Sequence, residues 1–175
     1  MSIPENVLYK LEGGVDETAL REILAEACAA PSMAALSPWA LVVVEPPFPA
    51  LLFDGAVEMT TPMEVSVKGI ADGAGVMIAV LSEKERPAAG EAAWSVISAV
   101  CGAARRRGLA CVVFQTGDET AALNLFKAPS WYRLAAIAAI GLPGEEVGAY
   151  QLKPLETCVV LHRQGDNEPF PPAVG

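Results

Sequence analysis

Apolar residues recur at helical spacing in two stretches of the chain, and the residues at their ends favour helix boundaries. The first stretch lies between Asp16, whose side chain can cap a helix, and Pro31, which cannot continue one. The second covers residues 87–107 and ends in three arginines before a glycine, which is typical of a helix C-terminus. Asp118 can cap a shorter helix that ends near Phe126. The buried face of the first helix consists of Leu20, Ile23, Leu24 and Ala27.

Largely apolar runs of strand length alternate with these helices. Because the runs are continuous, they predict strands that are buried on both faces. Residues 45–72 are irregular and rich in proline, which fits either a cover over the core or a substrate-facing flap. We favour the cover, since apolar residues under a long loop usually pack. The runs are residues 40–44, 76–81, 111–114, 133–140 and 157–161. The alternation predicts an α+β fold with α/β-type layers, in which helices cover a central sheet.

Length and composition predict a single domain over residues 1–175, with residues 164–175 as an extended C-terminal tail. Hydrophobic residues make up 53% of the chain, but no apolar run reaches the ~18 residues that cross a bilayer. We attribute the excess to a buried sheet and a subunit interface, and expect no membrane partner. The net charge of −9 argues against nucleic acid, which requires clustered cations. We expect no signal peptide and a cytoplasmic protein.

Cysteine and histidine offer little catalytic material. The four cysteines form no Cys-x-x-Cys pair and lie in apolar stretches, so we expect buried free thiols in a reducing compartment. The single histidine, His162, leaves little from which to build a zinc site or a catalytic triad. We identify no catalytic residue and no metal site. The cysteines are Cys28, Cys101, Cys111 and Cys158.

Residues 30–39 read APSMAALSPW and lead into the first predicted strand. This segment resembles the one that opens the flavin site in the nitroreductase family, which has Asn and Gln where this chain has Ala35 and Ser37. Three further segments resemble family motifs in the same order. They are a central helix that leads through glycine into a strand, a proline turn with an apolar strand, and a closing Lys-Pro-Leu-Glu. These segments cover residues 90–113, 129–143 and 153–156.

The resemblance implies a nitroreductase-like central mixed sheet flanked by helices, in an intertwined homodimer with two sites at the interface. In the family each site holds FMN, which NADH or NADPH reduces and which passes electrons to an acceptor. The chain thus resembles a divergent oxidoreductase for a small aromatic or quinone-like acceptor. The cofactor-binding residues that the resemblance implies are Pro31, Ser32, Met33, Ala35, Ser37, Asn6, Phe114, Gln115, Thr116 and Lys153.

Several of these side chains also have simpler interpretations. Ser32 lies in a Pro-Ser turn, where a serine equally often bonds its own backbone. Gln115 is the polar side chain best placed at a strand end, the usual location of sites in layered α/β proteins. We expect Trp39 to pack at the strand entry rather than to bind a ligand. Trp94 and Trp131 could line the interface cavity, but we favour packing in the core for both.

The phosphate end of the implied FMN site lacks the family's cations. Near the N-terminus Glu5 and Leu8 occupy arginine positions, and Asn6 replaces a serine. Leu152 occupies another cation position, with Lys153 shifted by one residue and hence to the opposite face of a strand. Each lost charge-assisted bond is worth ~1.5–3 kcal/mol, so we expect weak FMN binding. Two alternatives remain open: a flavin-free dimeric binding or regulatory module with the same cavity, and a structural partner of another protein.

Overall fold

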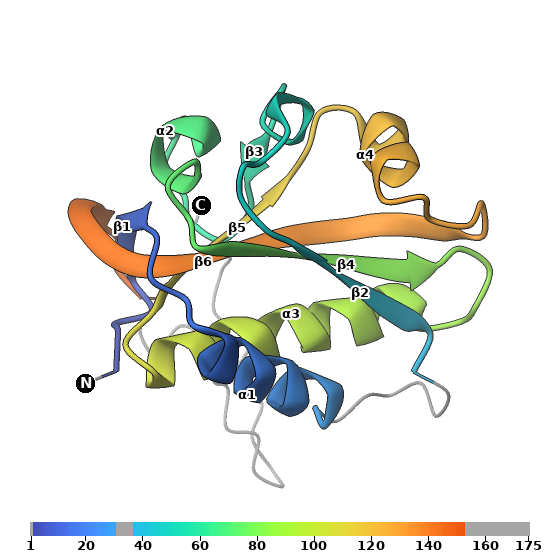
Figure 1. Cartoon of the computed structure of the whole chain (residues 1–175), viewed down its shortest axis with the longest axis horizontal. Helices are drawn as coiled ribbons and strands as arrows, with labels where there is room; N and C mark the ends of the chain where they lie inside the picture. The colour runs from blue at the N-terminus through green and yellow to red at the C-terminus, as the bar shows by residue number, and fades with distance from the viewer. Residues whose placement is uncertain (1, 31–36, 153–175) are drawn as a thin grey trace, which may run out of the picture.

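A computed structural model describes residues 2–30 and 37–152, which form a six-stranded sheet with helices on both faces (Figure 1). The strand order is β2-β4-β6-β5-β3, and β1 pairs with β6. The strands are β1 (Val7–Glu12), β2 (Trp39–Val44), β3 (Val57–Glu58), β4 (Val76–Glu83), β5 (Ala110–Gln115) and β6 (Tyr132–Ala149). The helices are α1 (Glu17–Cys28), the 3-10 turn η1 (Ala50–Leu52), α2 (Val67–Ala71), α3 (Ala89–Arg106) and α4 (Glu119–Leu125).

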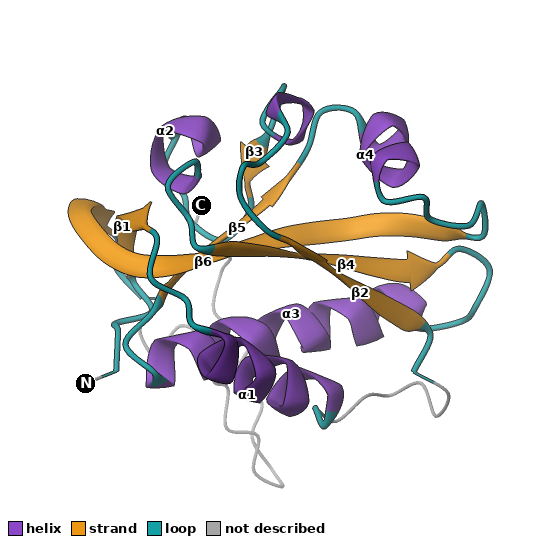
Figure 2. Cartoon of the chain, viewed as in Figure 1, coloured by secondary structure: helices purple, strands orange, loops and turns teal. Residues whose placement is uncertain are grey.

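Two helical layers enclose the sheet (Figure 2). The helices α1 and α3 lie on one face, and α2 and α4 lie on the other. Successive residues of a strand point to opposite faces, so Met77 and Ile78 enter different cores. Ile78 packs with Ile23 and Val100 on the α1/α3 side, whereas Met77 packs with Phe114 on the other side. The predicted α+β fold with helices flanking a central sheet is confirmed.

The strand β6 is the centre of the sheet. It pairs with β4 on one side and β5 on the other, and its far part pairs with β1. All named strand pairs among the described residues are antiparallel, and one isolated parallel bridge joins Gly13 to Ala74. The register places Ala138 of β6 between Ile78 of β4 and Val113 of β5.

The predicted helix boundaries agree closely with the structure. Asp16 caps α1 by accepting a hydrogen bond from the Ala19 backbone N–H at 2.8 Å, and Asp118 caps α4 by accepting from Ala121 at 2.9 Å. Gly108 follows α3 with a φ of 74°, a left-handed conformation that favours glycine. The three helices predicted from apolar spacing and caps are therefore confirmed.

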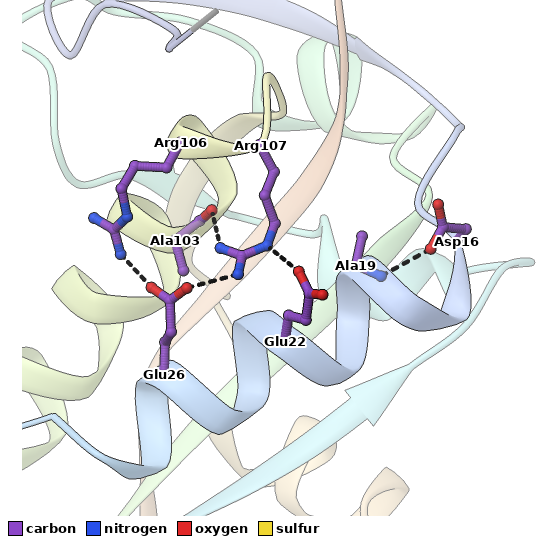
Figure 3. Close-up of polar contacts among 7 residues, drawn as sticks. All are labelled: Asp16, Ala19, Glu22, Glu26, Ala103, Arg106 and Arg107. Atoms are coloured by element: carbon purple, nitrogen blue, oxygen red, sulfur yellow. Dashed lines mark hydrogen bonds and ion pairs between the residues drawn. The ribbon is translucent and has the colours of Figure 1, made fainter.

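The arginines at the end of α3 hold α1 against it (Figure 3). Arg107 donates from Nε to Glu22 at 2.9 Å and from Nη2 to Glu26 at 2.6 Å. Arg106 also pairs with Glu26. These bonds from Arg107 and Arg106 lower the pKa of the Glu26 carboxyl. The arginine run thus completes a helix C-terminus and also links two helices of one layer.

The strand predictions were incomplete at β6 and β1. We expected β6 to end near residue 141, but it continues to Ala149 because β1 pairs with the second half of β6. Register shifts on both sides of Tyr9 accommodate the turn-like Gly-Leu-Pro-Gly sequence over residues 141–144 of β6. A side chain at Gly141 would approach the Gly13 carbonyl oxygen to 3.3 Å, so glycine permits the two strands to approach closely. No apolar alternation of the N-terminal residues had indicated β1.

Residues 45–72 cover one face of the sheet, as predicted. Leu52, Val67 and Ile70 are buried in the core beneath them. The short elements η1, β3 and α2 lie in this stretch and were not predicted. By contrast, β2 is an edge strand and not a fully buried one, and its Val43 is 39% exposed in the single chain.

The expectation of buried thiols was wrong for Cys28. This residue is exposed at the end of α1, because the helix turns the stripe containing Ile23 and Ala27 toward the sheet. Within residues 2–30 and 37–152 no helix is long and apolar enough to cross a membrane. The predicted last strand, the tail over 164–175, His162 and Cys158 lie outside the described residues.

Candidate functional site

The end of β5 carries three of the residues that the resemblance implied. Phe114 is fully buried and anchors the strand in the core. Gln115 is exposed, and its side-chain Nε2 donates to the Ala135 carbonyl oxygen at 2.9 Å. The Thr116 hydroxyl donates to the carbonyl oxygen of Leu51 at 3.1 Å. These two bonds attach the strand end to β6 on one side and to η1 on the other.

A small pocket opens beside this strand end. It has a volume of about 100 Å³ and is lined by Gln115, Thr116, Glu119 and Leu134. The Glu119 carboxylate accepts a hydrogen bond from the Leu134 backbone N–H at 2.9 Å. Pockets that enclose a whole cofactor usually measure ~300–1,000 Å³. The pocket of one chain therefore matches only a part of a flavin.

Asn6 lies far from the end of β5. It precedes β1, which pairs with the distal half of β6, whereas Gln115 bonds a residue near the beginning of β6. The Asn6 side-chain amide donates to the Tyr150 carbonyl oxygen at 3.0 Å, and its own carbonyl accepts from the Tyr150 N–H at 3.0 Å. One chain thus does not bring Asn6 and Gln115 together.

The residues at the family's cation positions have structural surroundings of their own. Leu8 is 3% exposed and belongs to the core on the α2 side. Glu5 is exposed, and its carbonyl oxygen accepts a hydrogen bond from the Tyr150 hydroxyl at 2.9 Å. Among the described residues of the N-terminal segment, residues 2–14, only Lys10 has a positively charged side chain. The segment does not supply the cations that a phosphate requires.

Ser37 lies at the same end of the sheet as Gln115. It is separated by Pro38 from β2, whose first residue pairs with Ser82 near the end of β4. Three strand spacings of about 4.8 Å separate β2 from β5, so a sideways gap of about 14 Å lies between the two strands. Ser37 is exposed with a φ of 44°, uncommon for a residue other than glycine. The implied site residues Pro31, Ser32, Met33, Ala35 and Lys153 lie outside the described residues.

Two pockets larger than the one at Gln115 lie elsewhere at this end of the sheet, and sequence reasoning missed them. They measure about 690 and 890 Å³ and share Glu83, Lys84 and Arg86. Trp94 of α3 lines one and Trp131 lines the other. We call the two together the tryptophan pocket. The tryptophans are 37% and 61% exposed, so the expectation that both pack in the core was wrong. A strand end, a turn and a helix start form this pocket, and no single motif could have revealed it.

The lining of the tryptophan pocket carries equal numbers of cations and anions. The cations are Lys84, Arg86 and Arg133, and the anions are Glu83, Glu85 and Glu91. Arg133 reaches into the pocket from β6 and hydrogen-bonds Ser82 through Nε at 3.3 Å. It makes no ion pair with the residues that the structure describes, whereas Arg86 is paired with Glu83 at 2.7 Å. Arg133 and Trp94 line the same pocket, and a guanidinium and an indole are groups suited to an anionic aromatic ligand.

Known structures share this arrangement of elements. No protein-family model and no curated protein matches the sequence. A nitroreductase family protein from Streptococcus pneumoniae TIGR4 matches with a TM-score of 0.73 and 14% identity, covering 90% of this chain and 96% of its own. An FMN-dependent nitroreductase from Clostridium difficile R20291 matches with a TM-score of 0.67 and 23% identity, covering 89% and 91%. Iodotyrosine deiodinase bound to FMN and 3-iodo-L-tyrosine matches with a TM-score of 0.68 and 20% identity, covering 91% and 95%.

These similarities extend over almost the whole described chain. The protein has a nitroreductase-like fold, as the resemblance of its motifs implied. At these identities the likeness concerns the fold, and the function has to be argued from the site.

Proposed function

We propose that this protein is a divergent flavin-dependent oxidoreductase that acts as a homodimer. In this proposal it passes electrons from NADH or NADPH through FMN to a small aromatic or quinone-like acceptor. The observation that carries the proposal is the end of β5, where Gln115 and Thr116 border a small pocket at the end of a nitroreductase-like sheet. Two of the similar structures are described as FMN-dependent or as bound to FMN.

The described residues fit one end of FMN and not the other. Backbone N–H groups near Gln115 and Thr116 would be the donors for the ring edge, on a strand end whose side chains bond Ala135 and Leu51. When bound, the flavin supplies the hydride and electron chemistry, which no side chain provides. The phosphate end lacks cations, since Asn6 is engaged with Tyr150 and Glu5 is an anion.

A second copy of the chain is part of the proposal. The pocket at Gln115 is too small for a complete flavin, and the N-terminal segment of the same chain lies at the far part of β6. A partner subunit can enclose the cofactor from outside the sheet, with the segment over residues 31–37 and Lys153 as its contacts. Trp94 and Val43 are exposed apolar residues that such an interface would cover.

The visible absorption spectrum of freshly purified protein is the first test. We expect a flavin band, which disappears with denaturation and extraction of the cofactor. The Gln115→Trp variant should fill the small pocket and lose the band, because Gln115 is exposed and tolerates a larger side chain. Leu125→Trp is the matched control, since Leu125 is 40% exposed on α4 and does not line the pocket. The rate at which the flavin band bleaches with NADH is then compared with the rate with NADPH, and the faster nucleotide is the electron donor.

A second candidate function is the flavin-free binding module, and the tryptophan pocket favours it. Arg133 and Trp94 there suit a small aromatic anion. Calorimetric titration compares the affinity for benzoate with that for benzamide, which has a similar shape but no charge. The difference between the two affinities gives the contribution of the ligand's charge. The binding module predicts benzoate binding that Arg133→Gln weakens and Lys127→Gln does not. Protein that takes up no flavin at any concentration, yet binds benzoate, would replace the first proposal by the second.

A further inference from the structure

Two cysteines that are remote from the proposed flavin site lie in direct contact. Cys101 in the last part of α3 and Cys111 near the start of β5 have their Sγ atoms 2.7 Å apart. The S–S bond of a disulfide measures about 2.05 Å, so a small movement of two side chains would join them. Neither sulfur is bonded to the other in this structure.

The surrounding fold brings the two residues together. The turn after Arg106 reverses the chain from α3 into β5, and Gly108 takes the left-handed conformation that the turn requires. Cys101 is 5% exposed and Cys111 is partly buried, on the α1/α3 side of the sheet. Cys111 is the less buried of the two, so a reagent as small as a hydroperoxide would approach the pair from its side.

We propose that Cys101 and Cys111 form a redox-active dithiol that a hydroperoxide converts to an intramolecular disulfide. The Cys101 thiolate attacks the peroxide O–O bond, which breaks and releases water or an alcohol and leaves a sulfenic acid on Cys101. The Cys111 sulfur then attacks that sulfenic sulfur, an S–S bond forms, and a second water leaves. Two thiols lose two electrons and two protons in all, and the hydroperoxide is the oxidant.

The assignment of Cys101 as the attacking residue has an electrostatic basis. A thiolate, rather than a thiol, is the nucleophile. The hydrogen bond with Cys111 lowers the pKa of Cys101, and the Arg105 cation adds to this effect against the opposing effect of burial. The same contact, together with burial, raises the pKa of Cys111. The pair therefore loses its first proton more easily than its second, and Cys111 keeps a proton for the leaving oxygen.

A disulfide here would connect a helix to the strand that carries Gln115. The cross-link would close the segment between α3 and β5 and fix the turn that includes Arg106 and Arg107. Because these arginines bind Glu22 and Glu26, oxidation should also make the docking of α1 on α3 more persistent. Removing chain freedom from the unfolded state predicts a higher melting temperature for the oxidised protein.

The experiment uses the full chain with Cys28→Ser and Cys158→Ser, so that only the pair remains. After hydrogen peroxide at neutral pH, we expect that no disulfide joins two chains and that the mass of each chain is lower by two hydrogen atoms. After unfolding, the two cysteines should resist alkylation. Peptide mapping should join Cys101 to Cys111, and dithiothreitol should restore both thiols. The same treatment of protein unfolded in guanidinium is the matched control, and it should form the bond many times more slowly.

Single variants test whether both thiols are needed. Cys111→Ser should leave Cys101 as a sulfenic acid that dimedone traps, and neither Cys111→Ser nor Cys101→Ser should give a chain that has lost two hydrogen atoms. Two results would overturn the proposal. One is that both thiols of the folded protein stay open to alkylation after peroxide, and the other is that folded and unfolded protein form the bond at the same rate. Neither result depends on whether the protein binds flavin.

Discussion

Glu5, Asn6 and Leu8 lie in one short segment, but their side chains have different surroundings. Glu5 projects into solvent, Asn6 is bonded to Tyr150, and Leu8 is buried in the core. Alignment to the family arginines treats the three positions alike, whereas the structure allows a new cation only at Glu5. An arginine at Leu8 would bury an unpaired charge, which is strongly unfavourable.

We predict that Glu5→Arg tightens FMN binding about tenfold and hardly changes riboflavin binding. The substitution replaces a repulsive anion by a charge-assisted donor, and only FMN carries the phosphate. Fluorescence titration of the apo-protein measures both affinities. Lys10→Gln in the same segment is a control for general charge. Equal gains for the two flavins would mean that Glu5 does not face the phosphate.

Phe114 is the residue that fixes the position of the proposed site. Its ring is fully buried and stacks against Phe53 with centroids 6.1 Å apart. We predict that Phe114→Ala lowers the free energy of unfolding by about 3–5 kcal/mol, the cost of emptying a large buried site. Urea denaturation measures this change. Trp131→Ala is the control, since Trp131 is 61% exposed and its removal should have a much smaller effect.

At the residue scale the sequence located an element boundary. The apolar run over residues 111–114 indicated that Gln115 lies at a strand end, and β5 ends there. The roles of Gln115 and Thr116 in a flavin site stay predictions. Trp94 and Arg133 were missed, because the tryptophan pocket arises where β4, β6 and α3 meet and none of these segments shows it alone. The exposure of Trp94 could not be deduced from helical spacing, which places it beside the buried stripe.

At the scale of elements, α1 and α3 are linked through Glu26 and two arginines. The bonds from Arg107 and Arg106 hold the pKa of Glu26 below its ordinary value. The linkage therefore stabilises the folded chain above the unfolded pKa of a glutamate and is lost as the pH falls through the lower folded value. Because the carboxyl is solvent-exposed, salt also weakens it.

We predict that Glu26→Gln unfolds at a lower urea concentration than the wild type at pH 7. At a pH below the folded pKa of Glu26 the two proteins should unfold alike, because the wild-type carboxyl is then protonated. Glu17→Gln, which removes an exposed pair with Arg21 within α1, is the control. A difference between Glu26→Gln and wild type that persists unchanged in strong acid would rule out the ion pairs as its cause.

Elements with an end signal were predictable, and those without one were not. Asp16 and Asp118 marked α1 and α4 through the same side-chain bonds that the structure contains. The strand β1 has no apolar run of its own and depends on register shifts against β6. The sequence therefore indicated only the half of β6 that β4 and β5 cover.

At the scale of the whole molecule, the exposed apolar residues call for a partner. Val43 on the edge strand, Trp94 on α3 and Trp131 in the turn before β6 are all large and exposed in the single chain. Obligate dimers bury surfaces of this kind over more than about 2,000 Å². The intertwined homodimer that the resemblance implied stays a prediction.

We predict a dimeric mass by light scattering at micromolar concentration. The Val43→Asp variant should shift the protein toward monomer, because it places a charge on the edge of β2. Val57→Asp is a control at an exposed valine of β3 on the opposite edge of the sheet. A monomeric wild type would contradict both the dimer and the shared flavin site.

The fold was predictable because four short motifs occur in a fixed order along the chain. The implied site stays a prediction. Five of its ten residues lie outside the described residues, and one chain does not bring Asn6 to Gln115. A site that two copies share cannot be assembled from the contacts of one chain.

The central place of β6 also bears on how the protein is made. The ribosome synthesises β4 and β5 before Tyr132, the first residue of the strand that lies between them. Until then β5 has no partner along one edge, and the emerging chain carries apolar strand edges of the kind that aggregate. Completion of the sheet therefore waits for the last described strand, and a chaperone that holds the nascent chain would have its greatest effect just before that point.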